Sequence, residues 1–231
     1  MKKFFTSESV TSGHPDKICD AISDAILDEA LRQDPASKMA VETTIKDNLI
    51  FIYGEANTNA DLPFEKIAKD KIREIGYTEE FEVLTKVSKQ SAEIYEAVMH
   101  DEADMGAGDQ GIMFGYACNE TPELMPAPIT YAQQLAMKLS AVRKSGELDW
   151  LRPDGKSQVS VQYGEDGSVE RIDTVVVSTQ HADSVSIKDL REAVIERVIR
   201  PTLPAQLIDG DTKFYVNPTG RFVVGGPAAD S

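Results

Sequence analysis

The sequence predicts an α+β protein that contains one hairpin–helix–strand unit twice. Two pairs of β-rich runs, each joined by a short polar turn, predict two hairpins. Each pair is followed by a segment of helical periodicity and then by one more strand-like run. The two sets are offset by about 120 residues, which indicates an internal duplication. Hairpin–helix units are common, so a chance likeness is the alternative.

The first unit opens with strands predicted at 39–45 and 49–58, which are joined by the turn Lys-Asp-Asn. A helix is predicted at 63–77 and a third strand at 81–88. The apolar side of this helix consists of Phe64, Ile67, Ile72 and Ile75.

The second unit repeats this order. Strands are predicted at 157–163 and 169–180, joined by the turn Glu-Asp-Gly-Ser. A helix over 186–200 is ended by Pro201, and a strand follows at 213–218.

Two more helices, at 15–34 and 129–146, are predicted outside the repeat. The first has a buried stripe at helical spacing. This stripe consists of Ile18, Ala21, Ile22, Ala25 and Ile26.

The start of the first helix carries groups suited to an anion or a metal ion. Pro15 fits the first helical position, so His14, Asp16 and Lys17 lie where free N–H groups attract anions. His14 and Lys17 can contact a phosphate, and Asp16 can hold a hard cation such as Mg²⁺. Alternatively, Asp16 only complements the helix dipole and His14 is a solvated turn residue. These residues alone favour the second interpretation.

The run GAGDQG at 106–111 matches the glycine pattern of dinucleotide-binding folds. That pattern requires a buried strand before it and a helix after it. Here an acidic stretch precedes the run, and IMFGYACN (112–119) is predicted to be a strand. The order is inverted, so the dinucleotide-binding interpretation is rejected. Asp109 is an acid presented by this loop.

Other polar groups border or interrupt the predicted strands, where sites are often built. Glu42 and Glu55 lie within strands, where the default is a solvent-facing carboxylate. Lys156 follows a predicted Pro-Asp-Gly turn, and Arg221 precedes Phe222, a charge and a ring that can flank a planar base. Each signal is weak alone.

Composition excludes several classes of partner. The net charge of −15 argues against nucleic acid and anionic membranes, because both attract clustered Lys and Arg. With 41% hydrophobic residues, no apolar run approaches membrane length, and the N-terminus is too polar for a signal peptide. Cys19 and Cys118 lack metal or redox spacing, so we expect reduced thiols in a cytoplasmic protein.

The motifs together resemble the S-adenosylmethionine synthetase (methionine adenosyltransferase) family. The resemblance rests on FTSESVTSGHPDKICD, GEANT, GAGDQG followed by GY, LMPAPITYA, WLRPDGKSQV, STQH and KFYVNPTGRFVVGGP. It covers nearly the whole chain. It implies an N-terminal unit at 1–97 and a central unit at 105–227, which are two of the three pseudo-symmetric units of the family's fold.

The resemblance also implies a reaction, in which the sulfur of L-methionine attacks C5′ of ATP and forms S-adenosylmethionine. The triphosphate is expelled and hydrolysed to pyrophosphate and phosphate, with Mg²⁺ and K⁺ as cofactors. Catalysis of this kind depends on alignment and on stabilising the leaving triphosphate.

Roles for individual residues follow from the resemblance alone. The implied catalytic residues are His14, Asp109 and Lys156. The implied ATP-binding residues are His14, Asp154, Gly155, Lys156, Arg221, Phe222 and Asp230. The implied methionine contacts are Glu55, Gln90 and Asp230, and the implied metal ligands are Asp16 for Mg²⁺ and Glu42 for K⁺.

Members of this family are dimers or tetramers with active sites at the subunit interface, so we expect a homo-oligomer. The family sequence continues beyond GGPAADS into a third unit, whose Arg and Lys residues grip the triphosphate. Two hypotheses follow. The chain is the first two units of a synthetase, or it is a non-catalytic homologue that binds nucleotide or serves as a dimerising module.

Overall fold

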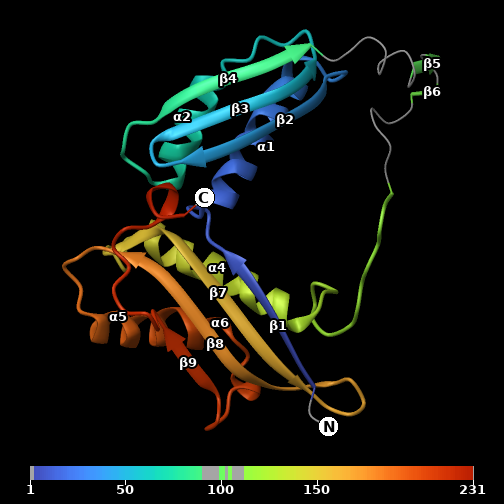
Figure 1. The fold of residues 1–231 in the computed structure, drawn as a ribbon. Helices are drawn as coiled ribbons and strands as arrows, with labels where there is room; N and C mark the ends of the chain where they lie inside the picture. Colours follow the sequence, from blue (N-terminus) through green and yellow to red (C-terminus); the bar gives the residue numbers. More distant parts are fainter. Residues whose placement is uncertain (1–2, 90–98, 102–103, 106–111, 231) are drawn as a thin grey trace. The chain divides into compact units, whose positions relative to one another are not determined.

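The structure, a computed structural model, describes residues 3–89, 99–101, 104–105 and 112–230. It divides into two compact units (Figure 1). Unit 1 comprises Met1–Lys17 and Tyr116–Asp230, and unit 2 comprises Ile18–Gly115.

Unit 2 is a three-stranded sheet with helices on one face. The strand order is β2-β3-β4, with β2 and β3 antiparallel and β3 and β4 parallel. Its elements are α1 (Pro15–Gln33, in unit 2 from Ile18 onward), β2 (Lys38–Lys46), β3 (Leu49–Asn57), α2 (Phe64–Ile75) and β4 (Glu82–Lys89). A short ladder pairs β5 (Met99–Asp101) with β6 (Asp104–Met105).

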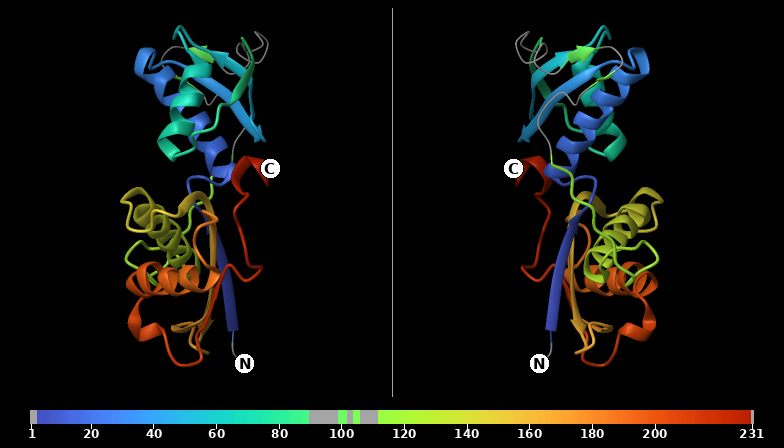
Figure 2. Two further views of the ribbon diagram at one scale, coloured as in Figure 1. Left: turned by 90° about the vertical axis from the view of Figure 1, so that its left-hand side faces the viewer. Right: turned by 90° about the vertical axis from the view of Figure 1, so that its right-hand side faces the viewer.

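The core of unit 2 confirms the isoleucines of the predicted helix stripe, whereas Ala21 and Ala25 are only half-buried. The isoleucines of α1 are fully buried against the isoleucines of β2 and β3 and against α2. The buried isoleucines are Ile18, Ile22, Ile26, Ile45, Ile50, Ile52, Ile72 and Ile75. Both helices therefore cover the same face of the sheet (Figure 2).

Unit 1 is a four-stranded sheet in the order β1-β7-β8-β9. β1 and β8 pair with β7 in antiparallel fashion, and β9 pairs with β8 in parallel. Its strands are β1 (Lys3–Val10), β7 (Leu151–Tyr163), β8 (Val169–His181) and β9 (Lys213–Val216). Its helices are α4 (Ala127–Lys144), α5 (Ile187–Val194), the π-helix η1 (Ile195–Ile199), α6 (Arg200–Thr202) and the 3₁₀ turns η2 (Ala205–Leu207) and η3 (Gly226–Ala228).

The internal repeat is confirmed by the strand pairing. In each unit a hairpin is followed by a helix and by a strand that pairs in parallel with the second hairpin strand. The prediction that two helices stand outside the repeat is wrong. α1 and α4 each precede a hairpin and contribute buried residues to the core of its sheet. The repeated unit is therefore helix–hairpin–helix–strand.

Two local predictions are corrected, and one strand was missed. The predicted turn Pro153-Asp154-Gly155 lies inside β7, because a register shift between Leu151 and Gly155 absorbs the proline. The segment 112–118 contains no assigned strand, and Met113 and Phe114 are both 88% exposed. The strand β1 was not foreseen, because its partner β7 lies about 150 residues further along the chain.

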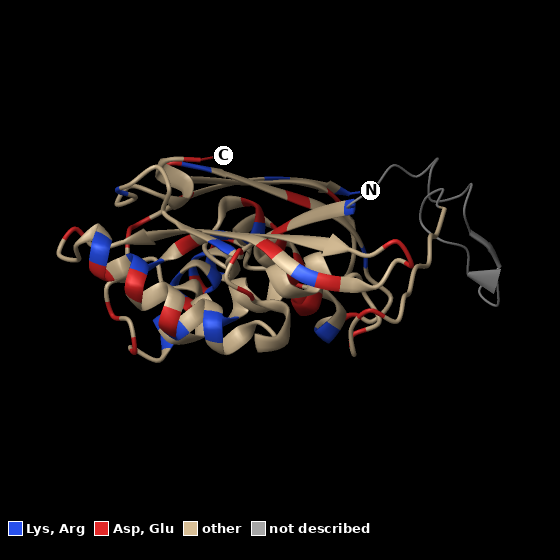
Figure 3. Cartoon of the chain, turned by 90° about the horizontal axis from the view of Figure 1, so that it is seen from below, with Lys and Arg blue, Asp and Glu red and all other residues tan. Residues whose placement is uncertain are grey.

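Acidic and basic residues interleave along the helices seen in Figure 3. Within the part of the chain that the structure describes, no helix combines the length and apolar character needed to cross a membrane.

Candidate functional site

The turn between β1 and α1 is fixed to β7 in unit 1. The Thr11 N–H donates to the Gly155 carbonyl at 2.9 Å, and the Thr11 hydroxyl donates to the Pro153 carbonyl at 2.7 Å. A Cβ placed on Gly13 would lie 2.3 Å from the Cβ of Pro153, so only glycine fits there. These contacts hold His14 at the N-terminus of α1.

The imidazole of His14 lies between two carboxylates. The residue is 9% exposed, and its Nδ1 accepts the Asp16 N–H at 3.3 Å. Its Nε2 lies 3.4 Å from Oδ2 of Asp230. Because Nδ1 acts as an acceptor, this network assigns the proton of the neutral ring to Nε2. A protonated ring carries that proton as well, so His14 offers an Nε2–H in both charge states.

Asp154 fixes the other side of this cluster. It is 4% exposed, and its Oδ2 accepts the Gly226 N–H at 2.7 Å. Burial raises the pKa of Asp154, while the Gly226 N–H and His14 act in the opposite direction. The Gly226 carbonyl accepts the Asp230 N–H at 3.0 Å, so Asp154 indirectly holds Asp230 beside His14.

Lys156 lies on β7 and is partly solvated. Its Nζ is 3.1 Å from Oε1 of Glu8 on β1, and both side chains are about half exposed. An ion pair exposed to this degree contributes only about 0–1 kcal/mol, so a phosphate can replace the carboxylate at little cost. Gly155 is buried between Thr11 and Leu139, where a Cβ would be crowded. Its resolved role is therefore packing.

Arg221 and Phe222 lie on the segment that follows β9. The Arg221 guanidinium pairs with Asp183 at 2.6 Å, and both side chains are exposed. The backbone of Phe222 is bonded to His181 through both its N–H and its carbonyl. The backbone that carries Arg221 and Phe222, the two side chains expected to flank a nucleotide, is thus anchored to the end of β8.

Glu42 and Glu55 lie on unit 2. Glu42 is opposite Tyr53 in the β2–β3 ladder, and Glu55 is opposite Ala40. Tyr53 stacks on Phe51 with ring centroids 5.1 Å apart. By the alternation along each strand, both carboxylates share the sheet face that α1 and α2 leave open.

The structure thus brings four of the predicted residues into one cluster: His14, Asp16, Asp154 and Asp230. Gln90 and Asp109 lie outside the described residues. Among the described ranges, no three His, Cys, Asp or Glu side chains form a group that could hold a metal ion by themselves.

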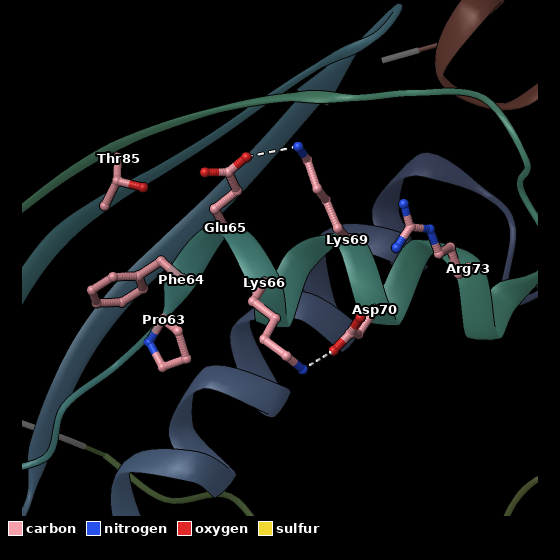
Figure 4. A pocket seen from close by; sticks show the side chains of 8 residues that line it. All are labelled: Pro63, Phe64, Glu65, Lys66, Lys69, Asp70, Arg73 and Thr85. Carbon is pink, nitrogen blue, oxygen red and sulfur yellow. Dashed lines mark hydrogen bonds and ion pairs between the residues drawn. The ribbon is translucent and has the colours of Figure 1, made fainter.

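A separate hollow of about 560 Å³ lies over α2 in unit 2, lined in part by Pro63 and Thr85 (Figure 4). Two ion pairs join charged side chains of its lining, Lys69–Glu65 at 2.7 Å and Lys66–Asp70. None of the predicted site residues lines this hollow, so it is not part of the candidate site.

Sequence reasoning missed three residues that shape the site. Glu8 pairs with Lys156, His181 holds Phe222, and Asn217 holds the start of the same segment. His181 and Asn217 lie within the motifs STQH and NPTG, but no spacing rule connects either of them to a partner on another element.

The fold and the site together define an α+β protein with duplicated units and a histidine–carboxylate cluster at a helix N-terminus. The S-adenosylmethionine synthetase central domain model matches residues 104–222, and the N-terminal domain model matches residues 2–100. The chain therefore belongs to the S-adenosylmethionine synthetase family. A protein of Desulfosudis oleivorans named S-adenosylmethionine synthase is 52% identical over 237 residues, covering 98% of this chain and 61% of the relative. The chain thus spans less than two thirds of that relative.

Proposed function

We propose that this chain carries the first two units of a methionine adenosyltransferase, with family domains at 1–97 and 105–227. The reaction forms S-adenosylmethionine from ATP and L-methionine and releases phosphate and pyrophosphate. The observation that carries the proposal is the His14 imidazole, buried at a helix N-terminus with Nε2–H directed at an anionic oxygen of Asp230.

His14 stabilises the charge that develops as the triphosphate leaves. Its Nε2–H donates to a triphosphate oxygen in place of Asp230, which is 66% exposed and can move aside. Lys156 exchanges its Glu8 partner for a phosphate oxygen. Arg221 and Phe222 bind the nucleotide, with Asp154 holding the segment that carries them. Asp109 completes the set of catalytic residues.

The hard oxygen donors present suit the two proposed cations. Asp16 is an 82% exposed carboxylate beside His14, and Mg²⁺ in nucleotide sites commonly takes one or two carboxylates with phosphates and waters. Asp16 would hold Mg²⁺, which offsets triphosphate charge, and Glu42 would hold K⁺. Methionine would contact Glu55, Gln90 and Asp230.

We also propose a homo-oligomer with sites at the interface. The open face of the unit 2 sheet exposes Tyr53 (39%) and Leu84 (46%), apolar area that a second copy would cover. We further propose a cytoplasmic location, because Cys19 and Cys118, both among the described residues, form no disulfide.

The test is S-adenosylmethionine formation by the purified chain with methionine, MgATP and K⁺. Loss of one oxyanion donor typically costs about 10²- to 10³-fold in rate, so His14→Ala is expected to fall by that factor. Lys188→Ala removes an exposed cation of α5 and serves as the control. Product formation that is equal in both variants would refute the role of His14. Nucleotide binding without product would favour the alternative of a non-catalytic, nucleotide-binding or dimerising homologue.

A further inference from the structure

We propose that His181 is a positioning residue that holds Arg221 and Phe222 in place for the nucleotide, a role that rests on the proposed function. His181 is the last residue of β8, and it is 1% exposed. It is therefore too deeply buried to meet the substrate and acts through the segment that it holds.

Both ring nitrogens of His181 have partners. Nδ1 lies 2.8 Å from the Ala182 carbonyl, and Nε2 lies 3.0 Å from the Phe222 nitrogen. A carbonyl can only accept, so Nδ1 carries the proton, and Nε2 must then accept the Phe222 N–H. The surroundings thus fix a single neutral tautomer of His181.

The backbone of His181 completes the attachment. Its N–H donates to the Phe222 carbonyl at 2.9 Å, so one residue binds both polar groups of Phe222. The Gln180 side chain donates to the Val223 carbonyl at 3.0 Å. The end of β8 is therefore hydrogen-bonded to the segment around Phe222, although that segment is not itself a strand.

The same segment is anchored before Arg221. The Asn217 side-chain amide accepts the Thr179 N–H at 2.8 Å and donates to the Thr179 carbonyl at 3.0 Å. The Arg191 guanidinium donates to the carbonyls of Val216 and Asn217, each at 2.9 Å. Asn217 and Phe222 thus fix the backbone on both sides of Arg221.

This anchoring leaves only the Arg221 side chain to be ordered when an anion binds. The side chain is 64% exposed, and its partner Asp183 is 68% exposed. Binding by an ordered backbone avoids the entropy cost of fixing a loop. Release of Phe222 from His181 would restore that cost and weaken nucleotide binding.

The experiment compares His181→Leu, which removes the acceptor for Phe222, with His181→Gln, whose Oε1 can occupy the position of Nε2. Gln162→Leu is the matched control, because it removes another buried polar side chain of the same sheet, one bonded to Glu170. Two quantities are measured for each variant: hydrogen exchange at the Phe222 amide, and the Kd of MgATP by calorimetry.

Loss of one such hydrogen bond corresponds to roughly a tenfold change. We expect His181→Leu to exchange the Phe222 amide roughly tenfold faster and to bind MgATP roughly tenfold more weakly. We expect His181→Gln and the control to behave like the wild type. Unchanged exchange in His181→Leu, or faster exchange with unchanged Kd, would overturn the proposal.

Arg221→Ala separates this proposal from the proposed function. Suppose that the wild type binds MgATP and that Arg221→Ala does not. If His181→Leu then binds MgATP as the wild type does, only the proposed role of His181 is wrong. If the wild type does not bind MgATP, the proposed function fails for this chain. The proposed role of His181 in nucleotide binding is then wrong as well. Hydrogen exchange at the Phe222 amide still decides whether His181 holds the segment that carries Arg221 and Phe222.

Discussion

Gly13→Ala tests the contact that holds His14 in place. The added Cβ would lie 2.3 Å from the Cβ of Pro153 and 2.4 Å from its carbonyl carbon and oxygen. Ordinary contact begins near 3.4 Å, so the turn must move by about 1 Å away from β7. The backbone of Pro153 lies within a strand and cannot yield as the end of a flexible side chain would.

The magnitude follows from the bonds that such a shift breaks. The Thr11 bonds of 2.9 and 2.7 Å to Gly155 and Pro153 would both be lost. Each contributes about 1 kcal/mol net, and overpacking adds about 1–2 kcal/mol of residual strain. The expected loss is therefore about 3–4 kcal/mol in the free energy of unfolding, together with displacement of His14 from Asp230.

The assay is urea denaturation followed by circular dichroism, with MgATP binding measured on the folded variant. Gly210→Ala is the control, because a Cβ at Gly210 meets nothing within 4 Å. A Gly13→Ala variant within about 0.5 kcal/mol of this control would refute the proposed packing of the turn.

Three further predictions concern unit 1. Burial raises the pKa of Asp154, so the folded state binds the carboxyl proton more tightly than the unfolded chain does. The protonated carboxyl therefore stabilises the fold at low pH, and this contribution is lost as the pH rises above 3.8, the usual pKa of an aspartate. Asp154→Asn, which keeps an acceptor for the Gly226 N–H, should therefore stabilise the protein in urea at pH 7 more than at pH 3.5; equal effects would contradict this. Asn217→Ala removes two buried hydrogen bonds at a residue with φ of 42° and should lower the free energy of unfolding in urea by about 2–3 kcal/mol. A loss below about 0.5 kcal/mol would show that Asn217 does not anchor the segment after β9. Tyr163→Phe removes a 2.6 Å hydrogen bond to the Glu120 carboxylate and should lower the free energy of unfolding by about 2 kcal/mol. An unchanged urea midpoint would show that this hydrogen bond does not stabilise the fold.

Local pattern was sufficient to predict most elements of the fold. The β-rich runs at 39–45 and 169–180 predicted β2 and β8 to within a residue or two, because strands with one face buried against helices are rich in such residues. The isoleucine spacing of α1 predicted its buried face for the same reason.

Long-range pairing was not predictable from these patterns. Every residue of β1 is exposed or half-buried, so its sequence lacks the alternation that marks a strand, and its partner lies far along the chain. β7 contains Pro153, which indicates a turn by local rules, yet a register shift keeps it within the strand.

In the candidate site, too, local patterns were readable from the sequence and contacts between distant elements were not. His14 and Asp16 were noticed at the helix start, because dipole effects act locally, but those residues alone favoured a structural interpretation, and the resemblance gave them their roles. Asp154 and Asp230 were assigned by resemblance, since nothing in their spacing indicates that Gly226 connects them. The anchors His181 and Asn217 depend on bonds between separate elements, which no periodicity encodes.

The central claim is that the cluster around His14 receives the phosphates of the nucleotide. The most direct measurement is calorimetric binding of MgATP to the 231-residue chain and to its His14→Ala variant, with Lys188→Ala as control. We predict binding by the wild type and the control, and a Kd at least about tenfold higher for His14→Ala, the equivalent of about 1.4 kcal/mol. Equal affinity in all three proteins would contradict the claim, as would the absence of binding to the wild type.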